Sequence, residues 1–188
     1  YFKDKIKFIF NSKPDGRIFL NSLIKYYFGF GDNKKSIYRD MGIDKPFFDI
    51  KKENKSINKD YDLVYCGSIN QRSGLIDCII NLLKLDFKIL LIGSISDDLY
   101  HLLSSYKSIE MTGKIDRLEI PNLYSKAYCG LNFTPNQYPF NFQTSTKTLE
   151  YCAANLGVLS SKYFWSENFV KSRYGKFLWL EDLKSKKQ

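Results

Sequence analysis

The amino-acid sequence predicts an α/β protein built on a parallel sheet that is flanked by helices. Short apolar segments typical of strands alternate with helical segments from Asp62 onward, and two of the strand segments end in Gly-Ser. Hydrophobic residues make up 44% of the chain, which is ample for a core. Strand–helix–strand connections of this kind are right-handed and make consecutive strands parallel.

The first part of the chain is predicted to be separate from this pattern. KIKFIF (Lys5–Phe10) has the composition of a strand, and RIFLNSLIKYYF predicts an amphipathic helix that ends at Gly29 and Gly31. A polar, lysine-rich run follows, so we expect a linker over residues 51–60 between a unit at 1–50 and a domain at 61–188.

In the second part of the chain, predicted strands alternate with predicted helices. Strands are expected in DLVYCGSI, FKILLIGS, IEMTGKI, YCGLNFTP and GVLSS, and helices in GLIDCIINLLKL, DDLYHLLSSY, PNLYSKA and the segment that begins near Lys147. A helix, a glycine, a short strand and a last turn follow Ser161. Ligands of parallel sheets sit beyond the carboxyl ends of the strands, where Gly67–Ser73, Gly93–Asp97, Gly113–Asp116 and Thr134–Thr146 would meet.

The segment TSTKTLEYCAANLGVLSS carries the clearest chemical signal. Thr144, Ser145 and Thr146 offer hydroxyls that can cap a helix, and Asn155 is expected to end it. Lys147 lies in the first turn and Glu150 one turn further on, on nearly the same face. A helix N-terminus beside a lysine favours an anion, and a carboxylate favours hydroxyls. The alternative is that the hydroxyls only cap the helix and that the two charges form a solvated pair.

TKTLEYCAANLGVLSS resembles the TK-x-x-EY-x-A-x-G-x-PV-x-x-S segment of retaining GT-B glycosyltransferases of the group-1 family. The resemblance implies that Glu150 holds the ribose hydroxyls of a nucleotide-sugar and that Lys147 lies near its phosphates, with Thr146 beside them. MGIDKPFF resembles the passage where these enzymes cross between their two domains. TGKIDRLEIPNLYSKA resembles the stretch that borders the nucleobase, which assigns that role to Lys114 and Ile115.

CGSINQRSG resembles the phosphate loop of the same family, in which glycines, an arginine and a lysine surround the diphosphate. Here Gly67 is kept, Ser68 stands at the arginine position and Ser73 at the lysine position, so Arg72 is the cation of this loop. Gly93 is assigned to the same nucleotide-sugar site. The resemblance implies that Arg72 and Lys147 stabilise the charge on the leaving diphosphate. Phe142 stands where many members carry an additional glutamate.

The resemblance therefore implies a Rossmann-like sheet forming the C-terminal half of a GT-B fold, truncated at its end and preceded by a remnant of the acceptor domain. The expected reaction is hexosyltransferase-type transfer, with retention, from a nucleoside-diphosphate sugar to a glycan or a lipid-linked acceptor. No metal or other cofactor is expected, and we expect the fragment to be inactive alone. The alternatives are a degenerate, non-catalytic GT-B module and a nucleotide-sugar epimerase.

Bulk properties add expectations about partners. The formal net charge of +9 favours anionic partners, including a membrane surface, although a well-solvated basic surface is an equal alternative. No nucleic-acid-binding module is recognisable. The four cysteines lack metal-ligand spacing and there is one histidine, which is typical of a reduced cytoplasmic protein. We expect the cytoplasm, or the cytoplasmic face of the membrane, as the location.

Overall fold

The computed structural model describes residues 15–27, 35–50, 59–70, 74–173 and 175–183. Its strands form two sheets, a small pair and a large sheet of six strands in the order β5-β4-β3-β6-β7-β8. All strand pairs are parallel. The six strands are β3 (Tyr61–Cys66), β4 (Ile89–Ile92), β5 (Ile109–Met111), β6 (Ala127–Asn132), β7 (Gly157–Ser160) and β8 (Leu178–Trp179). This confirms the α/β class and the parallel sheet.

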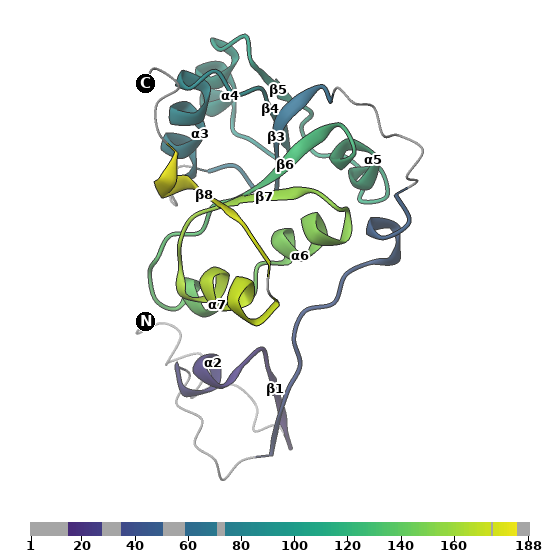
Figure 1. Ribbon diagram of the computed structural model, residues 1–188, viewed down its shortest axis with the longest axis vertical. Helices are drawn as coiled ribbons and strands as arrows, with labels where there is room; N and C mark the ends of the chain where they lie inside the picture. The colour runs from purple at the N-terminus through teal and green to yellow at the C-terminus, as the bar shows by residue number, and fades with distance from the viewer. Residues whose placement is uncertain (1–14, 28–34, 51–58, 71–73, 174, 184–188) are drawn as a thin grey trace.

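Helices cover both faces of the large sheet (Figure 1). On one face, α3 (Leu75–Lys84) and α4 (Asp97–Ser104) pack through a core of leucine and isoleucine side chains. On the other face, α5 (Ile120–Tyr124) and α6 (Thr146–Ala153) pack through a core rich in tyrosine. The sheet is therefore the middle of three layers, and the four residues of β4 are all buried.

The tight fit of α6 on the sheet depends on Gly130 of β6. A Cβ atom at this position would lie 2.2 Å from the ring of Tyr151, which is completely buried. The Tyr151 hydroxyl donates to the Leu131 carbonyl and accepts the Cys66 N–H, both at 3.3 Å. Because this one side chain joins α6 to β3 and β6, it places the start of the helix over the carboxyl ends of these strands.

The small sheet differs from the prediction made from the sequence. RIFLNSLIKYYF is not one helix, because β1 (Arg17–Phe19) comes first and α2 (Ser22–Tyr27) follows. The Asn21 side chain accepts the Ile24 N–H at 3.0 Å and so starts the helix after the strand. The strand pairs with β2 (Ser36–Tyr38), which was not expected. The strand predicted over Lys5–Phe10, the helix end at Gly29 and Gly31, and most of the linker lie outside the described residues.

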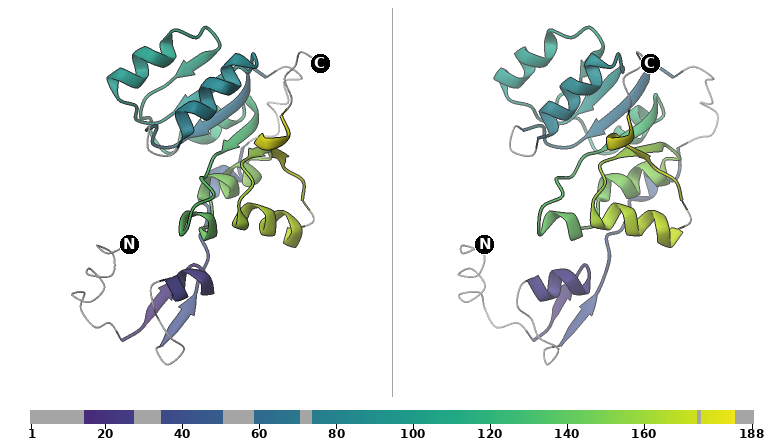
Figure 2. Two further views of the ribbon diagram at one scale, coloured as in Figure 1. Left: turned by 90° about the vertical axis from the view of Figure 1, so that its left-hand side faces the viewer. Right: turned by 60° about the vertical axis from the view of Figure 1, so that its left-hand side comes forward.

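The small sheet lies at the end of the molecule nearest α7 (Phe164–Arg173), apart from the large sheet (Figures 1 and 2). Asn21 donates from its amide to the Phe142 carbonyl at 2.9 Å, and Thr144 donates to the Asp40 carboxylate at 2.6 Å. The short helix η4 (Phe140–Phe142) lies in this contact region. The chain then runs through η1 (Lys45–Phe47), whose Phe47 is buried in the core beside α5.

Three remaining features complete the fold. The short helix η5 (Leu180–Asp182) follows β8. All four cysteines are free. No helix within the described ranges is both long enough and apolar enough to cross a membrane.

Candidate functional site

A pocket of about 490 Å³ lies where the order of the strands reverses. The chain moves outward from β3 through β4 to β5, and then returns to the other side of β3 to form β6, β7 and β8. Such a reversal leaves a crevice beyond the carboxyl ends of the two central strands. The lining residues follow β3, follow β6 or begin α6: Tyr65, Ser68, Asn70, Phe133, Thr134, Pro135, Gln137, Phe140, Gln143, Thr144, Ser145, Thr146 and Lys147.

The N-terminus of α6 opens into this pocket. Ser145 is the N-cap residue, and its hydroxyl accepts the Thr148 N–H at 3.2 Å while donating to the Asn132 side chain at 2.8 Å. The Ser145 carbonyl accepts the Leu149 N–H. The N–H groups of Thr146 and Lys147 therefore stay available at the positive end of the helix dipole. This confirms the expected helix start.

Lys147 is the single charged side chain among the described residues that line the pocket. Its ammonium lies 5.4 Å from the centre of the Tyr65 ring, within the range of a cation–π contact. Burial lowers the pKa of Lys147, and the nearby Cys66 and Glu150 oppose this shift. A cation that has lost much of its hydration is attracted to an anionic ligand more strongly than a fully solvated lysine is, because water screens the attraction less.

The predicted glycines bring the ends of β3 and β4 together. A Cβ at Gly93 would lie 2.1 Å from the Gly67 carbonyl oxygen, so the two loops touch through their backbones. Gly67 also lies against the Lys147 side chain, whose Cε is 3.4 Å from where a Cβ would stand. The exposed Ser68 lines the pocket. Ser68, Thr146 and Lys147 therefore line one pocket, Gly67 lies against Lys147, and Gly93 packs against the Gly67 backbone. Their role in binding a nucleotide-sugar stays a prediction.

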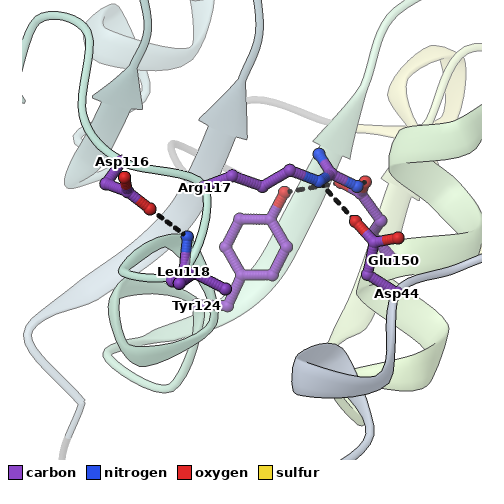
Figure 3. Close-up of polar contacts among 6 residues, drawn as sticks. All are labelled: Asp44, Asp116, Arg117, Leu118, Tyr124 and Glu150. Atoms are coloured by element: carbon purple, nitrogen blue, oxygen red, sulfur yellow. Dashed lines mark hydrogen bonds and ion pairs between the residues drawn. The ribbon is translucent and has the colours of Figure 1, made fainter.

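Glu150 lies beside this pocket rather than among its lining residues. It is 8% exposed, and its two oxygens are already engaged (Figure 3). Arg117 donates from Nη2 to Glu150 Oε1 at 2.8 Å, and the buried Tyr124 donates its hydroxyl to Oε2 at 3.3 Å. The Nε atom of Arg117 donates to Asp44 at 2.5 Å. Glu150 is thus a partnered carboxylate and not one arm of a solvated pair with Lys147.

The other sequence-predicted positions lie elsewhere. Lys114 is exposed, and Ile115 packs against the core that contains Tyr124; neither lines the pocket. Arg72 and Ser73 lie outside the described residues, so their predicted roles stay predictions. No group of three or more His, Cys, Asp or Glu side chains within the described ranges is placed to hold a metal ion.

Phe142, at the position of the additional glutamate, has a packing role. It packs against Phe19 of β1 and Ile24 of α2, and its ring lies 5.3 and 4.8 Å from the rings of Tyr138 and Phe164, measured between centroids. The neutral amides of Gln137 and Gln143 come from the loop that carries Phe142, and both residues line the pocket. The loop from 135 to 143 therefore presents hydrogen-bonding groups but no carboxylate to a ligand.

Sequence reasoning missed Arg117, Tyr124 and Asp44. These residues reach Glu150 from the loop after β5, from α5 and from the segment before η1. Arg117 stands two residues after Ile115, so its place in that loop was a weak signal. Its partners could not be inferred because they come together only in the folded chain.

Comparisons with known proteins agree on the architecture. No protein-family model matches the chain, and no curated protein matches it in sequence. Among solved structures, AviGT4, a glycosyltransferase involved in avilamycin A biosynthesis, is 14% identical with a TM-score of 0.61, covering 89% of this chain and 52% of its own. Sucrose-phosphate synthase from Thermosynechococcus elongatus is 15% identical with a TM-score of 0.63, covering 84% of this chain and 43% of its own.

A structure of trehalose-6-phosphate synthase adds a third match, with 13% identity, a TM-score of 0.62, and coverage of 89% of this chain and 50% of its own. The chain thus spans about half the length of the solved structures that it matches. At these identities the likeness concerns the fold. The six-stranded parallel sheet with its flanking helices matches half of a GT-B glycosyltransferase fold.

Proposed function

We propose that the chain provides the nucleotide-sugar-binding half of a retaining glycosyltransferase. In this proposal residues 61–188 bind a nucleoside-diphosphate sugar, and residues 1–50 belong to the half that meets the acceptor. The sugar moves to a glycan or a lipid-linked acceptor with retention. Resemblance in sequence motifs and likeness in fold support this reading, since the solved structures above include glycosyltransferases.

The observation that carries the proposal is the pocket at the strand reversal. It combines the free N–H groups at the start of α6, the partly desolvated ammonium of Lys147, and the close backbone approach at Gly67. These are the groups that bind a diphosphate: backbone donors, a helix dipole and a cation. We propose that Arg72 adds a second cation and that Thr146 and Ser68 donate to phosphate oxygens.

The rest of the nucleotide is assigned to the adjoining groups. Glu150 lies one helical turn beyond Lys147, so a ligand with its diphosphate at Lys147 can bring its ribose to the Glu150 carboxylate. We propose that the nucleobase lies against the loop carrying Lys114 and Ile115. The cation at Lys147 supports departure of the diphosphate, because negative charge grows on that group as the glycosidic bond breaks.

A second candidate, a non-catalytic GT-B module, draws on two observations. Ser68 stands where a phosphate-binding arginine is expected, and the Glu150 carboxylate already has two partners. A module of this kind would keep the fold and bind no nucleotide at this pocket. The epimerase alternative gains no specific observation.

Calorimetry and thermal unfolding with UDP, GDP and ADP at millimolar concentration test the proposal. A ligand at about ten times its dissociation constant stabilises the protein by roughly 1.4 kcal/mol, which shifts the melting temperature by about 3 to 6 °C. One nucleotide should produce this shift, and both Lys147→Ala and Glu150→Ala should abolish it. Lys126→Met is the control, because it removes an exposed charge immediately before β6, at the amino end of that strand, whereas the pocket lies beyond the carboxyl ends.

The possible outcomes separate the two candidates. A shift lost in the pocket variants and kept in the control supports nucleotide binding and identifies the base. No shift with any nucleotide, from protein that unfolds cooperatively, favours the non-catalytic module. A shift that both pocket variants retain would place the nucleotide somewhere else and contradict the proposed site.

Location and acceptor are further parts of the proposal. The net charge of +9 supports contact with an anionic membrane surface, which a lipid-linked acceptor requires. We propose that the protein works at the cytoplasmic face of a membrane. Co-sedimentation with vesicles that contain phosphatidylserine, compared with neutral vesicles, tests this directly.

A further inference from the structure

The carboxylate of Glu150 is buried between a cation and a phenol. Arg117 donates to one oxygen at 2.8 Å and Tyr124 donates to the other at 3.3 Å, while the residue is 8% exposed. Each carboxylate oxygen has two lone pairs, so one remains on each oxygen for a ligand hydroxyl.

Arg117 is itself held from two sides, by elements that are far apart in the chain. Its Nε donates to Asp44 at 2.5 Å while its Nη2 reaches Glu150, and its guanidinium lies 5.2 Å from the centre of the Phe47 ring. Figure 3 shows the side chain extending across Tyr124 toward both carboxylates. Although Arg117 has a 55% exposed side chain, these contacts restrict the guanidinium.

We propose that Arg117 is a positioning residue for Glu150, and that it fixes the carboxylate for recognition of a vicinal ribose diol. This inference rests on the proposed function. Two adjacent hydroxyls need two acceptor oxygens held in one orientation, and the planar guanidinium with the Tyr124 hydroxyl provides that constraint. The Glu150 side chain is then already ordered before the ligand binds, so binding does not have to supply the entropic cost of ordering it.

The same contacts connect the site to the segment that leads from the small sheet. Asp44 immediately precedes η1, and the buried Phe47 anchors η1 in the core beside Tyr124. Arg117 therefore holds Glu150 against a fixed element. Loss of Asp44 should loosen Arg117 and weaken diol binding less than loss of Arg117 itself.

The test compares each nucleoside diphosphate with its 2′,3′-dideoxy counterpart, using calorimetry on the full chain. Wild type should bind UDP, GDP or ADP more tightly than the corresponding dideoxy compound. Arg117→Met should weaken the nucleotide roughly tenfold and leave the dideoxy compound unchanged. The nucleotide affinity of Arg117→Lys should lie between those of wild type and Arg117→Met, because lysine keeps the positive charge but lacks the planar guanidinium with its several N–H donors. Lys126→Met, a matched loss of one exposed positive charge, should change neither affinity.

A double-mutant cycle keeps the test valid if an unpartnered Glu150 prevents folding. On a Glu150→Gln background the buried charge is gone, and Arg117→Met should then have no further effect on nucleotide affinity. A further loss on this background would overturn the proposal.

Three other results would also overturn it: equal losses for both ligands, unchanged affinity for both, or tighter nucleotide binding in Arg117→Met, which would make Arg117 a competitor of the ribose. Equal affinity of wild type for the two ligands would exclude recognition of the diol. Absence of binding by wild type to either ligand is a separate outcome, since it contradicts the proposed function itself and this inference with it.

Discussion

Replacement of Gly130 by alanine tests how the fold positions the site. The added Cβ would lie 2.2 Å from two ring atoms of Tyr151, whereas carbon atoms in contact are about 3.5 Å apart or more. The ring would have to retreat by about 1.3 Å, and it is completely buried. Its hydroxyl would then lose its contacts with the Leu131 carbonyl and the Cys66 N–H.

The expected cost combines these effects. Overpacking of a buried site costs about 1 to 3 kcal/mol, and each weakened hydrogen bond adds about 1 kcal/mol. We expect Gly130→Ala to lower the free energy of unfolding by about 3 to 5 kcal/mol, and the melting temperature by roughly 10 to 15 °C. Nucleotide affinity should fall as well, because α6 carries both Lys147 and Glu150.

Urea denaturation followed by circular dichroism measures this change. Gly42→Ala is the matched control, since no atom lies within 4 Å of its added Cβ, and it should stay within about 0.5 kcal/mol of wild type. In Gly130→Ala/Tyr151→Leu the smaller side chain leaves room, so the combined loss should be less than the sum of the single losses. A stability of Gly130→Ala equal to that of Gly42→Ala would refute the reasoning.

Three further predictions concern the same helix. Tyr151→Phe should lower the free energy of unfolding by about 1 to 2 kcal/mol, measured in urea, because two backbone groups lose a buried partner; no change would contradict this. Asn155 has φ of 56°, so Asn155→Ala should cost about 1 kcal/mol in the same assay while Asn155→Gly stays close to wild type. Burial lowers the pKa of Lys147, so its protonation favours the unfolded chain. The free energy of unfolding in urea should therefore rise with pH between that lowered pKa and the ordinary value of 10.5. Nucleotide affinity should fall over the same pH range, because the ammonium loses its charge. Lys147→Met should remove the pH dependence of both the stability and the affinity over this range.

The local pattern of apolar and polar residues was sufficient to predict most strands of the large sheet. ILLI of β4 is apolar throughout, as expected for a strand covered on both faces, and the structure buries all four residues. Ser145 caps α6 and Asn155 adopts the left-handed conformation that ends it, both as predicted from residue type. These features depend on a few neighbouring residues, which is why sequence alone predicts them.

The N-terminal unit shows where local pattern failed. Ile18 and Phe19 fit a helical face as well as a strand, and the choice was made by pairing with Ser36–Tyr38 and by the Asn21 cap. Strand pairing depends on residues that are distant in the chain, so periodicity cannot decide it. The same limit explains why the predicted helix began too early.

The sequence by itself determined the alternating order of strands and helices and the chemical groups at the start of α6. Only the tertiary structure decided that Lys147 enters the pocket while Glu150 turns to Arg117 and Tyr124. It also decided that Gly130 leaves space for the Tyr151 ring, which lets α6 pack closely on the sheet. The physical reason is that these contacts join residues from separate elements, and burial and close packing select among partners that local spacing leaves undecided.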